Sequence, residues 1–249
     1  MIPEEQLIEV FKALSDPNRL HLFKLLLISD RTNSELIGET GLKQNLLSHH
    51  LSALAECGLI HAQQSIGDAR RRYYCPNLDI VSAVSRWWRL HSPSDQRPLP
   101  SLPKPLTVLF LCLRNGERSL IAEAVTRHMA PNALIPYSAG VQVANDISPL
   151  VGEVLREHKL PTDSLSTQTY HALTEIPFDY VVTVCDRVHE HPLPIEFADA
   201  QYLHWSLRDP HEEANTPAGQ LIIARELFTE IEQRLAFFVN YMAHTSEGP

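Results

Sequence analysis

Apolar residues recur at helical spacing near the start of the chain: Leu7, Val10, Phe11 and Leu14. This spacing predicts an amphipathic first helix. Asp16 and Pro17 predict the start of a second helix, because aspartate is a favoured N-cap and proline fits a first helical turn. The second helix is apolar on most sides, and we expect six of its residues to form the core of this region: Leu20, Leu22, Phe23, Leu25, Leu26 and Leu27.

Two further helices are predicted from Thr32 to Glu39, ended by Gly41, and from Lys43 to Cys57. The buried side of the later helix is expected to carry Leu46, Leu47, Leu51, Leu54 and Ala55. Its outward face carries polar side chains that can donate to phosphates or read base edges in a DNA major groove: Lys43, Gln44, Asn45, Ser48, His49 and Ser52. Of His49 and the neighbouring His50, we expect one on the surface and the other packed in the core.

Residues 59–77 predict a hairpin of two short strands around Ile66-Gly67-Asp68, and the second strand is basic, with a cluster of three arginines, Arg70, Arg71 and Arg72. A last helix is expected from Asp79 to about Leu90. A polar helix followed by a basic hairpin predicts a winged helix-turn-helix that binds DNA. The alternative is a winged helix that contacts protein, with its polar surface merely solvated.

The pattern changes after this helix. Five prolines lie among serines and charged residues between His91 and Pro105, so this stretch cannot lie inside a helix or a central strand. We expect residues 93–105 to form a semi-rigid linker between two domains, residues 1–92 and 106–245. Beyond it, short apolar runs alternate with amphipathic helices, which predicts an α/β domain with a parallel sheet.

The clearest chemical motif follows a predicted buried strand, Leu106 to Leu111. Eight residues lead from it into a helix that runs to about Met129: Cys112, Leu113, Arg114, Asn115, Gly116, Glu117, Arg118 and Ser119. Backbone N–H groups that converge at a helix N-terminus bind anions and favour a thiolate, which makes Cys112 the candidate nucleophile. The residues from Leu113 to Arg118 are therefore expected to surround an oxyanion.

Three side chains of this loop have expected roles. Arg118 can bind two oxyanion oxygens at once, Ser119 can donate to the thiolate, and Asn115 can hold the shape of the loop. A buried core cysteine followed by a polar turn is the alternative. This alternative does not explain why a cysteine, an asparagine, an arginine and a serine all stand at the positions that an anion-binding loop requires.

Composition and charge refine this picture. The chain has 249 residues and a net charge of -9, but residues 1–98 hold 11 basic and 11 acidic residues, so the whole negative excess lies in the second half. A neutral first half can bind DNA where its basic residues cluster. Four widely spaced cysteines, Cys57, Cys75, Cys112 and Cys185, favour individual thiol chemistry over a disulfide scaffold. No membrane span or secretion signal is recognisable, so we expect a cytoplasmic protein.

Residues 5 to 90 resemble the ArsR/SmtB family of metalloregulatory repressors. The stretch KQNLLSHHLSALAECGLI is similar to the family's recognition helix, and the basic hairpin is similar to its wing. The resemblance implies operator DNA as a partner and a homodimer formed through the first and last helices, including Trp87 and Trp88. The CxC pair of arsenic-responsive members is absent from TNSELIGET. A weak arsenite site built from Cys57 and Cys75 is a hypothesis.

Residues from about Thr107 to Phe238 resemble the low-molecular-weight protein tyrosine phosphatase superfamily, whose fold has a four-stranded parallel sheet. The Cys112 loop and Ser138-Ala139-Gly140 carry the resemblance. Later motifs are similar to the arsenate reductase branch: FDYVVTVCD leads to a candidate redox cysteine, Cys185, and His204-Trp205 precedes an acid loop with Asp209-Pro210. The tyrosine that usually follows this Asp-Pro pair in phosphatases is absent.

The resemblance implies a reaction on arsenate or a phosphate-like oxyanion. Cys112 attacks the arsenic, Asp209 protonates the departing oxygen, and Arg118 with the loop amides holds the charge. A second thiol then releases arsenite. No bound cofactor is expected, only an external thiol reductant: thioredoxin, glutaredoxin with glutathione, mycothiol or bacillithiol.

The redox relay departs from that of thioredoxin-coupled relatives, which carry a further cysteine in a Cys-Pro pair. This chain has His191-Pro192 near that position. Either Cys112 and Cys185 form a disulfide that an external redox partner reduces, or a small thiol attacks the arseno-cysteine directly.

The sequence therefore predicts an arsenic-responsive repressor fused to a thiol-dependent arsenate reductase. A phosphatase of phosphotyrosine or small phosphoesters, fused to the same DNA-binding domain, is one alternative. A repressor whose degenerate second domain only senses an oxyanion is another. Glu117 favours the latter, because a carboxylate near a dianion opposes binding unless its side chain points outward.

Overall fold

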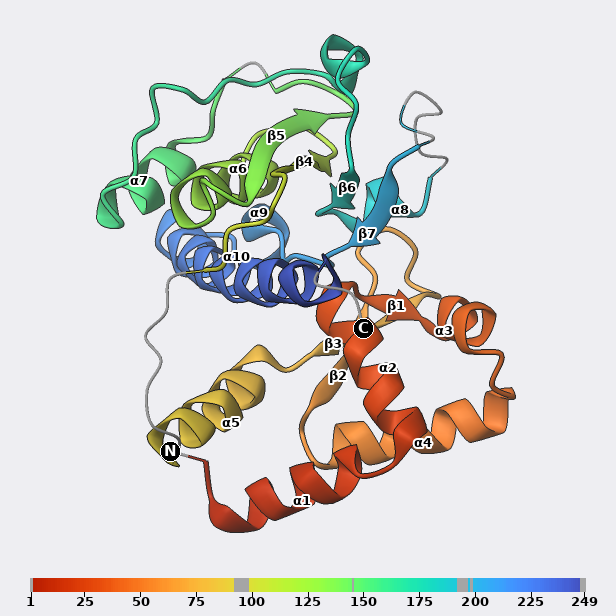
Figure 1. Ribbon diagram of the computed structural model, residues 1–249. Helices are drawn as coiled ribbons and strands as arrows, with labels where there is room; N and C mark the ends of the chain where they lie inside the picture. Colours follow the sequence, from red (N-terminus) through yellow and green to blue (C-terminus); the bar gives the residue numbers. More distant parts are fainter. Residues whose placement is uncertain (1, 92–98, 145, 192–196, 198, 247–249) are drawn as a thin grey trace. The chain divides into compact units, whose positions relative to one another are not determined.

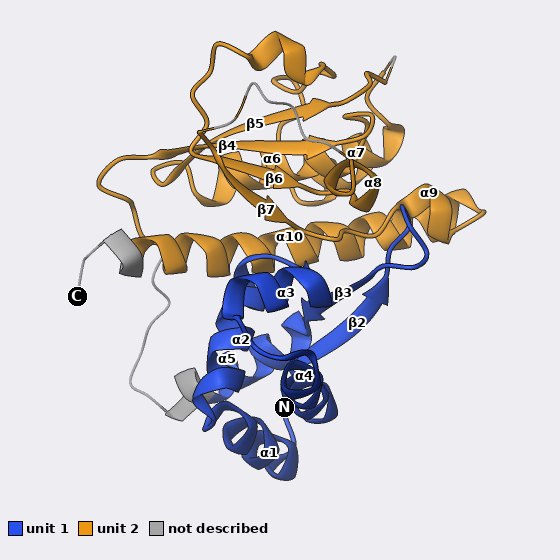
Figure 2. Cartoon of the chain, turned by 90° about the vertical axis from the view of Figure 1, so that its right-hand side faces the viewer, with its two compact units in different colours: residues 1–98 blue, residues 99–249 orange. Residues whose placement is uncertain are grey.

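The computed structural model describes residues 2–91, 99–144, 146–191, 197 and 199–246, with the side chains of 88–91 and 244–246 left aside. The chain divides into two compact units, residues 1–98 and 99–249 (Figure 2). Part of the predicted linker, residues 93–98, lies outside the described residues. Residues 99–105 contain no helix or strand.

The first unit is mostly helical, as predicted (Figure 1). Its helices are α1 (Glu4–Leu14), α2 (Pro17–Ile28), α3 (Asn33–Thr40), α4 (Gln44–Glu56) and α5 (Leu78–His91). Its strands are β1 (Arg31–Thr32), β2 (Ile60–Gln64) and β3 (Arg72–Pro76), which form an antiparallel sheet in the order β1-β3-β2. The pair β2 and β3 is the expected wing hairpin.

Local signals explain where these helices begin and end. Asp16 caps α2 by accepting from the N–H groups of Asn18 and Arg19. Thr32 and Glu35 form a capping box at the start of α3. Gly41 ends that helix with a φ of 67°, in the left-handed region that glycine adopts without strain.

The expected core of the first unit needs correction at Leu20, Leu46 and Ala55, and Leu25 and Leu27 are only half-buried. Leu46 is 43% exposed and Leu20 39% exposed, while Phe11 and Ala55 are also exposed. On α4 the buried residues are Leu47, His50, Leu51 and Leu54, which follow the helical repeat. Leu46 and Ala55 lie off that stripe, and His50 takes a core position on it.

The predicted dimer surface is only partly described. Phe11 of α1 contacts Trp87 of α5 edge to face, with ring centroids 6.0 Å apart. The side chain of Trp88 lies outside the described residues. A homodimer through α1 and α5 stays a prediction.

The second unit is an α/β domain with the predicted four-stranded parallel sheet (Figure 1). Its strands β4 (Leu106–Cys112), β5 (Leu134–Gly140), β6 (Tyr180–Thr183) and β7 (Gln201–His204) lie in the order β5-β4-β6-β7. Its helices are α6 (Arg118–Met129), α7 (Pro149–Glu157), α8 (Asp186–His189), α9 (Pro210–Glu213) and α10 (Pro217–Ser246), with a 3₁₀ turn at Tyr170–Leu173. Helix α10 packs against α6 and α7.

The sheet brings separate parts of the sequence to one edge. Cys112 is paired in register with Gly140, and Leu111 with Thr183. Because the strands are parallel, their carboxyl ends meet there, which is where α/β sheets bind ligands. Within the described residues, no helix is long and apolar enough to cross a membrane.

Candidate functional site

The loop between β4 and α6 wraps around the thiol of Cys112. The Asn115 N–H donates to Cys112 Sγ at 3.0 Å, and Ser119 Oγ lies 3.0 Å from the same sulfur. Asn115 adopts a φ of 53°, a left-handed conformation that asparagine tolerates better than most side chains. The loop thus surrounds the sulfur with donors.

The side chain of Asn115 fixes the loop to the rest of the domain. Its Nδ2 donates to Ser119 Oγ and to Ser138 Oγ, both at 2.9 Å, while its Oδ1 accepts from the Gln168 N–H at 2.8 Å. Asn115, Ser119 and Ser138 are completely buried. A fully satisfied buried network of this kind is rigid, so the sulfur is held in one position.

The network continues to a residue that sequence reasoning did not single out. Ser138 Oγ donates to Glu123 Oε2 at 2.6 Å, and Arg127 forms an ion pair with the same carboxylate. Burial raises the pKa of Glu123, and the contacts with Ser138 and Arg127 oppose that rise. On the sequence Glu123 resembles an ordinary residue of an exposed helix face.

The segment after β5 supports the loop from its other side. The N–H groups of Val141, Gln142 and Ala144 donate to the carbonyls of Cys112, Leu113 and Arg114 at 3.1, 2.8 and 2.8 Å. Ser148 donates likewise to Gly116 at 3.3 Å. The two segments approach so closely at Gly140 that a Cβ there would lie 2.8 Å from the backbone of Arg114 and Asn115.

Arg118 and Asp209 lie together at the loop. Arg118 Nη2 donates to Asp209 Oδ2 at 2.8 Å, and Nη1 donates to the Leu207 carbonyl at 3.2 Å. Burial lowers the pKa of Arg118, but attraction to Cys185, Asp209, Cys112 and Glu117 outweighs it and raises the pKa overall. The guanidinium is therefore a permanent positive charge beside the thiol.

Cys112, Arg118 and Asp209 all line one cavity of about 260 Å³. The loop residues Leu113, Arg114, Gly116 and Glu117 line it as well. Side chains from α8 and the segment after β5 complete the wall, among them Arg187 and Asp146. A tetrahedral oxyanion is smaller than this cavity.

The Glu117 carboxylate has a partner on α9. His211, which follows Asp209-Pro210, lies with Nε2 at 2.7 Å from Glu117 Oε1. This pairing could not be predicted from the sequence, because the two residues are separated by 94 positions. The carboxylate thus belongs to an ion pair when His211 is protonated.

Cys185 is the N-cap residue of α8 and is buried. Burial raises the pKa of its thiol, while Arg118 lowers it and Cys112 raises it further, so the three groups are within electrostatic reach of one another. Cys112 is the last residue of β4, and Cys185 follows the adjacent parallel strand β6; both are free thiols. His191 is described, but its neighbour Pro192 lies outside the described residues.

The candidate DNA-contacting residues are exposed. On and before α4 these are Lys43, Gln44, Asn45, Ser48 and His49; in the wing they are Arg70, Arg71 and Arg72. Asp68 in the wing turn binds Arg70 through two contacts of 3.0 Å, and Arg70 holds the pKa of that carboxyl down at about 2. His49 is exposed and His50 is buried, as expected of such a pair.

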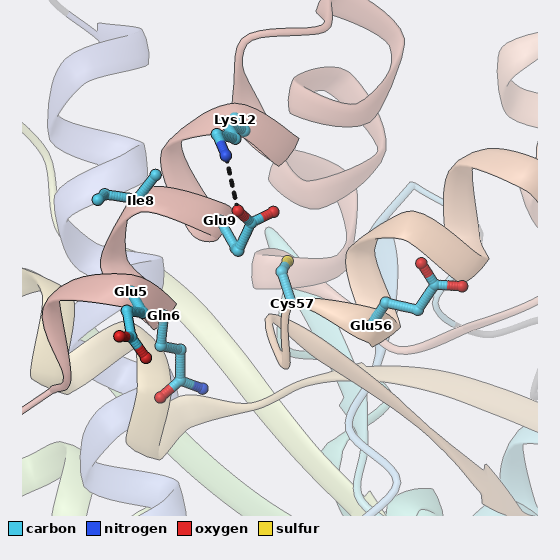
Figure 3. A pocket seen from close by; sticks show the side chains of 7 residues that line it. All are labelled: Glu5, Gln6, Ile8, Glu9, Lys12, Glu56 and Cys57. Carbon is cyan, nitrogen blue, oxygen red and sulfur yellow. Dashed lines mark hydrogen bonds and ion pairs between the residues drawn. The ribbon is translucent and has the colours of Figure 1, made fainter.

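The two remaining cysteines, Cys57 and Cys75, are buried in the first unit. Cys57 borders a pocket with Glu9 and Lys12 of α1 and Glu56 of α4 (Figure 3). Burial raises the pKa of its thiol. Cys75 lies on β3 opposite His61 and does not line this pocket. Across the described residues, no three metal-ligating side chains gather. An arsenite site on these thiols stays a hypothesis.

Comparison with known proteins gives a family for each unit. Residues 107–246 match the family model described as low molecular weight phosphotyrosine protein phosphatase. Residues 16–62 match the one described as bacterial regulatory protein, arsR family.

Individual relatives agree with this division. A probable mercury resistance operon repressor of Streptomyces lividans is 39% identical over 99 residues, covering 35% of this chain and 79% of that protein. An arsenate reductase of Shouchella clausii is 25% identical over 131 residues, covering 53% and 93%. Among solved structures, an arsenate reductase from Archaeoglobus fulgidus is 29% identical, with 53% and 98% covered and a TM-score of 0.44.

Proposed function

The chain belongs to the low molecular weight phosphotyrosine protein phosphatase family through residues 107–246, and we propose that this domain reduces arsenate with electrons from thiols. Residues 16–62 belong to the arsR family of bacterial regulatory proteins, so a DNA-binding domain is fused to an arsenate reductase-like or phosphatase-like domain. The proposed combination is an arsenic-responsive repressor that also detoxifies arsenate.

One observation carries the catalytic proposal. A thiol, a guanidinium and a carboxyl group line the same small cavity, and they come from Cys112, Arg118 and Asp209. The Asn115 N–H donates to the Cys112 sulfur and Ser119 Oγ lies 3.0 Å from it, which fixes the sulfur in position to act as the nucleophile. Arg118 offers paired donors to oxyanion oxygens. Asp209 in its acid form can protonate a leaving oxygen.

The proposed reaction begins with attack on arsenic. The Cys112 thiolate forms a sulfur–arsenic bond, and one arsenic–oxygen bond breaks as Asp209 donates its proton to the oxygen that leaves as water. The loop N–H groups and Arg118 stabilise the charge on the remaining oxygens.

Reduction then requires a second thiol. A thiolate attacks the Cys112 sulfur and forms a disulfide; the electron pair of the sulfur–arsenic bond passes to arsenic, which leaves as arsenite. Arsenic gains two electrons, and the two thiols lose them. Cys185 follows β6, the strand paired in parallel with β4, so it lies at the same edge of the sheet as Cys112, which supports its role as the attacking group. A protein dithiol then reduces the disulfide.

Replacing Cys185 by serine separates the two routes of reduction. If Cys185 is the attacking thiol, turnover with thioredoxin is expected to fall at least about 100-fold in Cys185→Ser. Turnover with glutathione and glutaredoxin, mycothiol or bacillithiol should persist if a small thiol attacks the arseno-cysteine. Stopped-time arsenite assays with each donor measure this. Unchanged thioredoxin-dependent turnover in the variant would remove Cys185 from the mechanism.

The proposal is tested against phosphatase activity by assaying arsenate reduction and p-nitrophenyl phosphate hydrolysis in parallel. Among the described residues, those that line the cavity include no Phe, Tyr or Trp, which leaves no aromatic wall for an aryl ester. We expect arsenate reduction to dominate. Efficient hydrolysis without arsenate reduction would favour a phosphatase, and oxyanion binding without either reaction would favour a sensor domain.

The DNA-binding part of the proposal rests on α4 and the wing. Exposed polar side chains of the helix face outward, and Arg72 is an exposed arginine at the start of β3. Asp68 holds Arg70 and lies 3.8 Å from Arg71, whereas Arg72 makes no such contact with it in the described structure. Arg72 is therefore the wing residue best suited to bind a phosphate.

Substituting Arg72 by alanine is expected to weaken operator binding about 3- to 10-fold and to lower the slope of log affinity against log salt by about one. The reason is the loss of one phosphate contact. Fluorescence anisotropy at several salt concentrations gives both values. Lys24→Ala removes an equal charge from α2 and serves as the control. Equal salt slopes for the two variants would argue against a wing contact at Arg72.

A further inference from the structure

Glu117 and His211 connect the two loops that bear the reactive groups. Glu117 is the N-cap residue of α6 and immediately precedes Arg118, while His211 lies in α9, two residues after Asp209. The His211 ring lies 2.7 Å from the Glu117 carboxylate, and its backbone N–H donates to Asp209 Oδ1 at 3.0 Å. His211 thus contacts two of the four acidic residues that line the cavity, Glu117 and Asp209.

The charges around this pair define its effect. Positive charge comes from Arg118 and Arg114 of the oxyanion loop and from Arg187 of α8, which is paired with Glu212 at 2.6 Å. Besides Glu117, negative charge comes from Asp209, Glu212 and Asp146. Asp209 and Glu117 both attract Arg118, so they compete with an incoming oxyanion for its charge. An unpaired Glu117 would also repel a dianion directly.

We propose that His211 is a positioning residue for oxyanion binding, and that it acts through Glu117. Its ring lies 2.7 Å from the Glu117 carboxylate, holds it in place and, when protonated, offsets its charge, so that the loop can accept a dianion although Glu117 lies next to Arg118. Glu117 is only 16% exposed, so water screens its charge poorly, whereas His211 is half exposed. The inference rests on the proposed function, because it assumes that the Cys112 loop binds an oxyanion.

The test is a double-mutant cycle on the full chain. Isothermal titration calorimetry with inorganic phosphate and with arsenate gives Kd for the unaltered protein, His211→Gln, Glu117→Gln and the double variant. His211→Gln keeps the backbone N–H that binds Asp209 but cannot carry a positive charge. We expect it to raise Kd about 10-fold or more, a shift of the size that one unpaired nearby charge produces.

Rescue is the result that a merely structural role would not give. The double variant has no carboxylate to neutralise, so its Kd should return to within about threefold of the unaltered value, and Glu117→Gln alone should bind at least as tightly as the unaltered protein. His128→Gln, at an exposed position of α6 outside the cavity, controls for loss of a histidine as such.

The outcomes separate this inference from the proposed function. Equal Kd for His211→Gln and the unaltered protein, or a double variant as weak as His211→Gln, would overturn the role of the pair. If the Kd values follow the expected double-mutant cycle but the protein does not reduce arsenate, the role of the Glu117–His211 pair would stand and the proposed reaction would be overturned. A protein that binds neither phosphate nor arsenate would overturn both.

Discussion

Replacement of Cys112 by serine is expected to abolish arsenate reduction, with a loss on the order of 10⁴-fold or more, while oxyanion binding changes little. The hydroxyl keeps the size of the side chain and its contacts with Asn115 and Ser119. It cannot form the sulfur–arsenic bond or the later disulfide, and a serine hydroxyl stays protonated where a thiol can ionise. Single-turnover arsenite release and phosphate titration measure the two quantities.

Cys75→Ser is the matched control for this variant, since Cys75 is also buried but belongs to the first unit. It should reduce arsenate at the unaltered rate. Turnover by Cys112→Ser within about tenfold of the unaltered protein would rule out Cys112 as the nucleophile.

Replacement of Gly140 by alanine is expected to have the second largest effect, lowering kcat/KM for arsenate at least about 100-fold. The added methyl group would overlap the Gln142 carbonyl oxygen and lie 2.8 Å from the backbone of Arg114 and Asn115. The loop must therefore move away from Gly140, and the donors around Cys112 move with it. A shift of about 1 Å in a reacting group is enough for such a loss.

Gly152→Ala provides the comparison, because no atom lies within 4 Å of a Cβ at this helical position. It should leave turnover unchanged and, as a glycine replaced within α7, keep or slightly raise the melting temperature. Circular dichroism shows whether Gly140→Ala remains folded. A folded Gly140→Ala with unaltered kinetics would mean that the close approach at this glycine does not shape the loop.

The strand, loop and helix around Cys112 could be predicted because the information that specifies them is local. Cys112, Asn115, Arg118 and Ser119 lie within eight consecutive residues, and a strand before them and a helix after them were readable from the apolar pattern. The two domains were readable for the same reason, since the change from helical to alternating pattern extends over many residues.

The partners of the loop could not be predicted, because they are distant in sequence. Gln168 reaches Asn115 across 53 positions, and His211 reaches Glu117 across 94. Neither Gln168 nor His211 belongs to a motif or a regular spacing that would mark it as a partner of the loop. Strand β1 has only two residues and leaves no alternating pattern. On α4, Leu46 and Leu47 are adjacent, and the apolar pattern alone does not show which of the two faces inward. Leu46 was therefore wrongly expected in the core.

In the proposed reaction, the burial of Cys112 and Cys185 should limit the rate of reduction differently for small thiols and for protein donors. Cys112 and Cys185 are each only 3% exposed, so the surface of a protein donor cannot approach either residue closely, whereas a small thiol needs less room in the cavity that Cys112 lines. A protein donor must wait for local opening, and the helix that directly follows Cys185, α8, has only four residues and can open locally. Arsenate reduction with a protein donor should therefore reach a maximum rate equal to the rate of local opening, and a higher donor concentration should not increase it further.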